Sequence, residues 1–230
     1  MCIRDSPAAV KNSSVLQGVS KELRSVDVQM LKVPEDGDCF YSACLQLLKS
    51  QQPELQSVQA ARAAVAARMT QADFTKLQIA AQAKPELPEY DWLRASGAPQ
   101  TLEEMQHYAR CCGKDCEECW WADETAITLF SAAAQVTVAV VEERMTHKKK
   151  QFNYVHVGNF DEIIFLHLKD EHYSALVLNC RGSWRRTRLP PTLTKKWCGL
   201  RSPVRRSALQ AAAVRPTTLA PASLPQAGPG

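Results

Sequence analysis

The sequence lacks a run of apolar residues long enough to cross a membrane or to serve as a secretory leader. Its longest uncharged stretch, Thr125–Val141, has 17 residues and includes Thr, Ser and Gln, whereas a membrane-spanning helix needs about 20 predominantly apolar residues. Residues 1–30 contain no continuous apolar core like that of a signal peptide. We therefore expect no membrane segment and a cytoplasmic or nuclear location, or both.

Acidic residues are missing from the C-terminal part of the chain. All 24 Asp and Glu residues lie within 1–180, while Lys and Arg recur through 181–230 among Pro, Ala and Ser. A segment of this composition cannot bury enough apolar surface to offset the entropy lost on ordering. We predict a disordered basic tail, whose charge is either simply solvated or makes weak contact with nucleic acid or an acidic partner.

With no leader, the nine cysteines favour a reducing compartment, so thiol or metal chemistry is expected rather than a disulfide framework. Cys116-x-x-Cys119 is the most metal-like spacing in the chain. Together with His107 and Cys112 it could supply the four N or S ligands of tetrahedral zinc. No second C-x-x-C pair at finger spacing accompanies it, so a redox thiol pair and an ordinary Cys-rich loop stay open.

The hydrophobic period changes from helical to strand-like along the chain. Lys84–Gln100 contains three prolines and is predicted to be a loop. Helices followed by strands with short turns predict an α+β domain whose sheet is covered by helices. Helices are expected at residues 39–49, 57–69, 72–83, 101–110 and 124–134, and strands at 26–33, 136–141, 151–157, 163–168 and 173–179.

These patterns divide the chain into three regions. Residues 1–25 are expected to be a disordered extension, in which 1–6 look unrelated to the rest of the chain and are interpreted as a scar. Residues 26–180 form the predicted domain, and residues 181–230 form the tail.

One cysteine stands directly after an acidic turn and at the start of an apolar helix, in Asp36-Gly37-Asp38-Cys39-Phe40-Tyr41. A helix N-terminus carries about half a positive charge, which favours a thiolate over a thiol. We therefore expect a lowered pKa for Cys39. The alternative is a small buried residue at a helix start, because free cysteine is among the most buried residue types.

A cysteine nucleophile needs a base within hydrogen-bond reach. Among the five histidines, His156 and His167 lie inside predicted strands, where a structural histidine is the common case. His172 instead lies in the turn Lys169-Asp170-Glu171-His172-Tyr173 between two apolar strands. This position at the mouth of a strand pair suits a residue that faces a cleft.

Three segments together resemble the motifs of ovarian-tumour (OTU) domain cysteine proteases, most of which are deubiquitinases. Asp36-Gly-Asp-Cys39-Phe-Tyr-Ser-Ala is similar to their nucleophile motif, and Glu171-His172-Tyr173-Ser174 to their His-Tyr motif. Trp121-Ala-Asp-Glu124, followed by a helix and a strand, is similar to the Trp-Gly segment between them, with Ala122 where glycine is usual. The resemblance covers about Val26–Cys180.

The resemblance implies a papain-like α+β fold with a small central sheet flanked by helices. It implies Cys39 as nucleophile, His172 as general base and Asp36 as the acidic residue of the nucleophile motif. Gly37 would take the positive φ that a tight turn requires, and the backbone around Gly37, Asp38 and Cys39 would form the oxyanion hole. The implied substrates are ubiquitin or polyubiquitin chains, and no cofactor is implied.

The residue that orients His172 is left open. Many family members have Asn or Asp two residues after the histidine, where this chain has Ser174. Asp170, two residues before His172, is the alternative. Without an effective orienting group the chain would be an inactive OTU-like ubiquitin-binding protein. A small zinc or nucleic-acid interaction protein, in which Cys39 is structural, is the third function considered.

Overall fold

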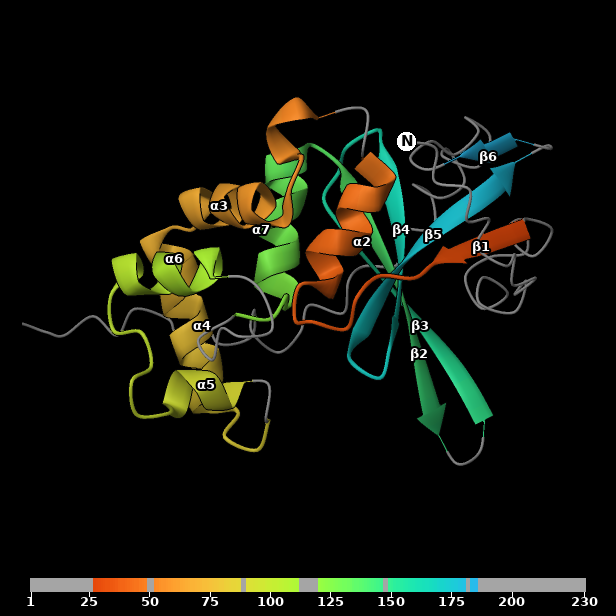
Figure 1. Cartoon of the computed structure of the whole chain (residues 1–230). Coiled ribbons are helices and arrows are strands. Elements are labelled where there is room, and N and C mark those ends of the chain that lie inside the picture. Colours follow the sequence, from red (N-terminus) through yellow and green to blue (C-terminus); the bar gives the residue numbers. More distant parts are fainter. Residues whose placement is uncertain are drawn as a thin grey trace, which may run out of the picture. The chain divides into compact units, whose positions relative to one another are not determined.

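The structure is a computed structural model, and it describes residues 27–48, 52–87, 90–111, 120–146, 149–180 and 183–185 (Figure 1). Helices dominate the first half of this part and strands the second half, which confirms the predicted α+β class. Within the described residues, no helix combines the length and apolar character that crossing a membrane requires.

The strands form one mixed, six-stranded sheet. Its order is β1-β5-β4-β2-β3, with β6 paired to β5. The pair β2–β4 is parallel and the other pairs are antiparallel. The strands are β1 (Asp27–Leu31), β2 (Thr137–Thr146), β3 (Lys149–Val157), β4 (Ile163–Lys169), β5 (His172–Cys180) and β6 (Ser183–Arg185).

The helices begin at capping residues that the sequence presents locally. Thr70 and Thr101 each form a capping box with an acidic residue three positions later, and Ser57 and Asp123 cap their helices with single side-chain acceptors. The helices are α2 (Cys39–Leu48), α3 (Val58–Arg68), α4 (Gln71–Ala83), α5 (Asp91–Arg94), α6 (Leu102–Arg110) and α7 (Glu124–Ala134), with a 3-10 turn, η2, at Pro53–Leu55.

The core that positions the site lies between α2 and the sheet. Helix α2 lies beside β5 and β4 and also contacts α3, which in turn packs against α6 and α7 (Figure 1). Phe40 is fully buried and makes edge-to-face contacts with Tyr41, Phe130 and Tyr173 at ring-centroid distances of 5.1, 5.4 and 5.4 Å. This aromatic cluster presses the first turn of α2 against the beginning of β5.

Two sequence predictions are corrected by the structure. Lys84–Gln100 is not entirely loop, because α5 forms between Pro88 and Pro99, where Arg94 donates hydrogen bonds to the carbonyls of Ala81 and Leu87 at 3.0 and 2.8 Å. The predicted disordered tail includes β6, which pairs with the end of β5. Residues 1–26 and 186–230 lie outside the described residues.

Candidate active site

Cys39 is the first residue of α2 and is only 8% exposed. The turn before it has the predicted geometry, with Gly37 at φ +72°, a conformation that glycine adopts without a steric penalty. The carbonyl of Asp38 accepts the amide of Ser42 at 2.9 Å and so starts the helix. The amide of Asp38 donates to Oδ1 of Asp36 at 3.2 Å. Asp38 is one of the three predicted oxyanion-hole residues, and its N–H already has this acceptor.

The sulfur of Cys39 lies where α2 meets β5. Backbone N–H groups of Tyr173, Phe40 and Cys39 itself lower the pKa of the Cys39 thiol, as the helix N-terminus leads one to expect. Burial is the larger influence, however, and together with the negative charge of Asp36 it leaves the pKa of Cys39 raised. The predicted lowered pKa is therefore wrong for the unliganded protein: desolvation of the thiolate outweighs the amide dipoles.

His172 is the first residue of β5. It follows the two-residue turn Asp170–Glu171, in which both residues have positive φ (49° and 64°), and it pairs with Lys169 across the turn. A turn of this kind matches the twist of the two strands it joins. Because Phe40 packs on Tyr173 with 5.4 Å between the ring centroids, the structure brings the residue after Cys39 to the residue after His172.

The two candidate orienting residues occupy different environments. Ser174 is two residues after His172 on the same strand, so the two share a face of the sheet, and it is only 7% exposed. Asp170 is exposed at the tip of the turn. Across from Ser174 on β4 is the buried His167, whose Nε2 lies 3.4 Å from a carboxylate oxygen of Glu143. The buried position of Ser174 therefore favours it over the exposed Asp170 as the residue that orients His172.

The middle motif lies against the same corner of the molecule. Trp120 is 1% exposed, whereas its neighbour Trp121 is 59% exposed. The indole of Trp120 donates to Asp123 at 3.3 Å, and burial raises the pKa of Asp123 to about 6. The hydroxyl of Tyr173 donates to the carbonyl of Ala122 at 3.4 Å, so this motif contacts the strand that carries His172.

Arg62 is a residue of this region that the sequence did not reveal. Its side chain is fully buried in α3 and its Nε lies 2.6 Å from a carboxylate oxygen of Asp38. The available signal was indirect: an acidic residue immediately before a buried helix needs a nearby cation, and Arg62 lies within the helix predicted at residues 57–69.

The proposed zinc ligands remain untested as a set. Cys112, Cys116 and Cys119 lie outside the described residues, while His107 is on α6 with its Nε2 3.9 Å from the sulfur of Cys111. In the segments that the structure describes, no group of three or more His, Cys, Asp or Glu side chains is arranged to hold a metal ion.

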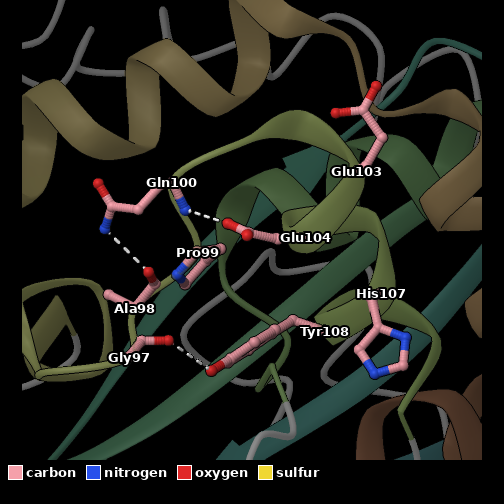
Figure 2. Close-up of a pocket in the computed structure, with 8 residues that line it drawn as sticks. All are labelled: Gly97, Ala98, Pro99, Gln100, Glu103, Glu104, His107 and Tyr108. Carbon is pink, nitrogen blue, oxygen red and sulfur yellow. Dashed lines mark hydrogen bonds between the residues drawn. The ribbon is translucent and has the colours of Figure 1, made fainter.

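His107 also lines a hollow of about 650 Å³ between α6 and the loop before it (Figure 2). Hydrogen bonds join residues of its wall to one another (Figure 2). The amide of Gln100 donates to Glu104 at 2.7 Å, and the hydroxyl of Tyr108 donates to the carbonyl of Gly97 at 3.0 Å. Cys39 and His172 do not line this hollow. This hollow is therefore separate from the predicted Cys39–His172 site.

No protein-family model matches the sequence, and no curated protein sequence matches it. Solved structures do. An OTU domain in complex with ubiquitin is 16% identical, with 82% of this chain and 91% of that chain covered and a TM-score of 0.44. The viral OTU domain protease from Taggert virus is 20% identical (71% and 85% covered, TM-score 0.40). An OTU deubiquitinase from Wolbachia pipientis wMel, bound to ubiquitin, is 12% identical (65% and 94% covered, TM-score 0.41).

The solved structures that this chain resembles are OTU domains.

Proposed function

We propose that this chain is an OTU-type cysteine protease that hydrolyses isopeptide bonds to ubiquitin or a ubiquitin-like modifier. The observation that supports this most directly is the contact between the beginning of α2 and the beginning of β5. Cys39 begins α2, and the next residue, Phe40, packs on Tyr173, the residue after His172, at a ring-centroid distance of 5.4 Å. A thiol at a helix N-terminus beside a histidine-bearing strand is the arrangement that nucleophilic thiol catalysis uses.

In the proposed reaction the imidazole of His172 takes the proton of the Cys39 thiol, and the thiolate attacks the carbonyl carbon of the isopeptide bond. The C–N bond then breaks, and His172 gives its proton to the leaving lysine amine. Water hydrolyses the resulting thioester with His172 again acting as base. We assign the amides of Cys39 and Phe40, at the start of α2, as donors to the developing oxyanion, and no cofactor takes part.

The raised pKa of Cys39 adds a requirement to this mechanism. At neutral pH the unliganded thiol is protonated, so proton transfer to His172 has to accompany substrate binding or attack. The same buried thiol supports the second candidate function, a catalytically inactive OTU-like protein that binds ubiquitin without cutting it. Both candidate functions predict that the chain binds ubiquitin, but only the protease predicts that it cleaves a ubiquitin substrate.

Hydrolysis of a fluorogenic ubiquitin C-terminal amide separates them. The proposal predicts turnover by the full chain and a loss of roughly a thousandfold or more in Cys39→Ala and His172→Ala. Cys111→Ala, a half-buried thiol at the end of α6, is the matched control and should retain activity. Ubiquitin binding with no turnover would establish the inactive alternative. No ubiquitin binding together with one bound zinc per chain would favour the zinc-protein alternative.

A further inference from the structure

Arg62 contacts three separate segments, residues 37–41, Ala109 and Trp120, although its side chain has no exposure to solvent. It pairs with the carboxylate of Asp38 and lies over the ring of Tyr41, with 4.6 Å between its Cζ and the ring centroid. It also donates hydrogen bonds to three backbone carbonyls, those of Gly37 at 3.3 Å, Trp120 at 3.0 Å and Ala109 at 3.5 Å.

Two of these contacts fix the turn that precedes Cys39. Arg62 binds the carbonyl of Gly37 and the side chain of Asp38, two consecutive residues. The orientation of the peptide group between them is therefore set by the guanidinium on its carbonyl side and by Asp36 on its N–H side. This peptide leads directly into the first turn of α2, from which Cys39 projects.

The remaining contacts connect Arg62 to the other wall of the site. Trp120, whose carbonyl accepts from Arg62, donates its indole N–H to Asp123. The next segment reaches β5 through the bond from the Tyr173 hydroxyl to Ala122. Since Tyr173 packs on Phe40, the residue after Cys39, these contacts form a closed circuit around the nucleophile.

Stability alone is a weak explanation for such a residue. A buried ion pair has to offset the desolvation of two charges, and apolar residues of similar volume often serve as well. What an arginine adds is geometry, because its planar fork presents several donors in fixed directions, which a lysine ammonium does not. Arg62 donates simultaneously to the Gly37–Asp38 turn and to the carbonyl of Trp120.

We propose that Arg62 is a positioning residue for Cys39: it holds the Gly37–Asp38 turn against the Trp120 segment and so fixes the place of Cys39 beside the beginning of β5. This inference deepens the proposed function, since it names what places the nucleophile. Its physical content, the placement of one thiol, can be measured without ubiquitin.

The variant that tests it is Arg62→Lys, which keeps a cation for Asp38 and loses the fixed directions of the guanidinium. The aromatic cluster of Phe40, Phe130 and Tyr173 stays in place, so Cys39 remains buried while its contacts with amide donors loosen. Thiolate-stabilising contacts are then lost with little gain in solvation, and the midpoint for ionisation of Cys39 moves to higher pH. The titratable groups that interact electrostatically with the thiol, Asp36, Cys44 and Tyr173, are unchanged in the variant, and so is His172.

The control is Arg94→Lys. Arg94 likewise donates to backbone carbonyls, those of Ala81, Lys84 and Leu87, and pairs with Asp91, but it touches none of the residues around Cys39. It therefore reports what a comparable loss of arginine hydrogen bonds does to the fold as a whole. All variants are compared at a temperature at which thermal unfolding curves show each of them to be folded.

The measurement is the rate of Cys39 alkylation by iodoacetamide as a function of pH in the full chain, with the modified residue located by mass spectrometry. We expect Arg62→Lys to shift the profile to higher pH and to slow alkylation near neutral pH about threefold to tenfold, while Arg94→Lys leaves the profile in place. An unchanged profile in folded Arg62→Lys, a shift to lower pH, or an equal shift in Arg94→Lys overturns the proposal.

A second readout separates this inference from the proposed function. If the wild-type chain cleaves the ubiquitin amide, Arg62→Lys should lower kcat roughly tenfold or more with little change in KM, because a misplaced nucleophile weakens attack and leaves substrate binding intact. A wild-type chain without turnover contradicts the proposed function, and the alkylation profile still decides the role of Arg62.

Discussion

At the scale of single residues, Cys39 experiences two opposed influences. Three backbone N–H groups stabilise its thiolate, and burial together with Asp36 destabilises it more. The helix N-terminus was visible in the sequence, whereas the burial of the sulfur depends on how α2 packs on β5. This is why the lowered pKa that the helix start suggested differs in direction from the one that the packed structure produces.

The choice between the two residues that might orient His172 is testable at the same scale. We expect Ser174→Ala to lower kcat for ubiquitin-amide cleavage about tenfold, because Ser174 is buried on the same face of β5 as His172. Asp170→Ala, at the exposed tip of the turn, should change kcat less than about twofold. A large loss in Asp170→Ala with none in Ser174→Ala would reverse the assignment.

Asp123 should give the protein a distinctive dependence of stability on pH. Burial raises its pKa from 3.8 to about 6 in the folded state, so between these values the folded state binds more protons than the unfolded state. The contribution of Asp123 to the free energy of unfolding is therefore full below about pH 4, declines up to about pH 6 and is constant above that.

The check is the difference in the free energy of unfolding between the wild-type chain and Asp123→Asn across this range of pH. The free energy of unfolding of the wild type should fall relative to that of Asp123→Asn as the pH rises from about 4 to about 6. Asp73→Asn is the control, because hydrogen bonds from Thr70 and the charge of Lys76 leave the pKa of Asp73 lowered from 3.8, so its difference should change little as the pH rises from about 4 to about 6. A flat difference for Asp123→Asn would contradict the account.

At the scale of elements, the turn that sets the start of β5 is strained. Glu171 has φ +64°, a conformation that costs a residue with a Cβ atom about 1–2 kcal/mol. We expect Glu171→Gly to raise the free energy of unfolding by about 0.5–1 kcal/mol after the larger unfolded-state entropy of glycine is counted. Equilibrium denaturation in urea measures this; a destabilised Glu171→Gly would mean that the turn has a different geometry in solution.

Elements whose signals are local were predictable, and contacts between distant elements were not. The first residues of α6 and α7 were predictable to within one position from the Thr101–Glu104 capping box and the Asp123 cap, because a cap acts over three positions. The pairing of Arg62 with Asp38 joins residues 24 positions apart. The burial of Trp120 in place of Trp121 likewise depends on packing, since adjacent identical residues carry no local signal that distinguishes them.

At the scale of the whole molecule, the boundary of the folded domain lies beyond the predicted one. The sequence placed the end of the domain at Cys180, but β6 pairs with residues 178–180 of β5. A chain that ends after Arg185 should keep the thermal stability of the full chain, whereas one that ends after Cys180 should lose about 1–2 kcal/mol with the hydrogen bonds of β6. Equal melting temperatures for the two truncated chains would show that β6 adds nothing.

The central claim, that Cys39 is a nucleophile served by His172 and directed at ubiquitin, is tested most directly by one reaction. The full chain is mixed with ubiquitin whose C-terminus carries a thiol-reactive electrophile, and the covalent adduct is located by mass spectrometry. The account predicts one adduct per chain at Cys39, abolished in Cys39→Ala and strongly slowed in His172→Ala, with Cys111→Ala unaffected. Labelling that persists in Cys39→Ala, or no labelling of a chain that binds ubiquitin, would contradict it.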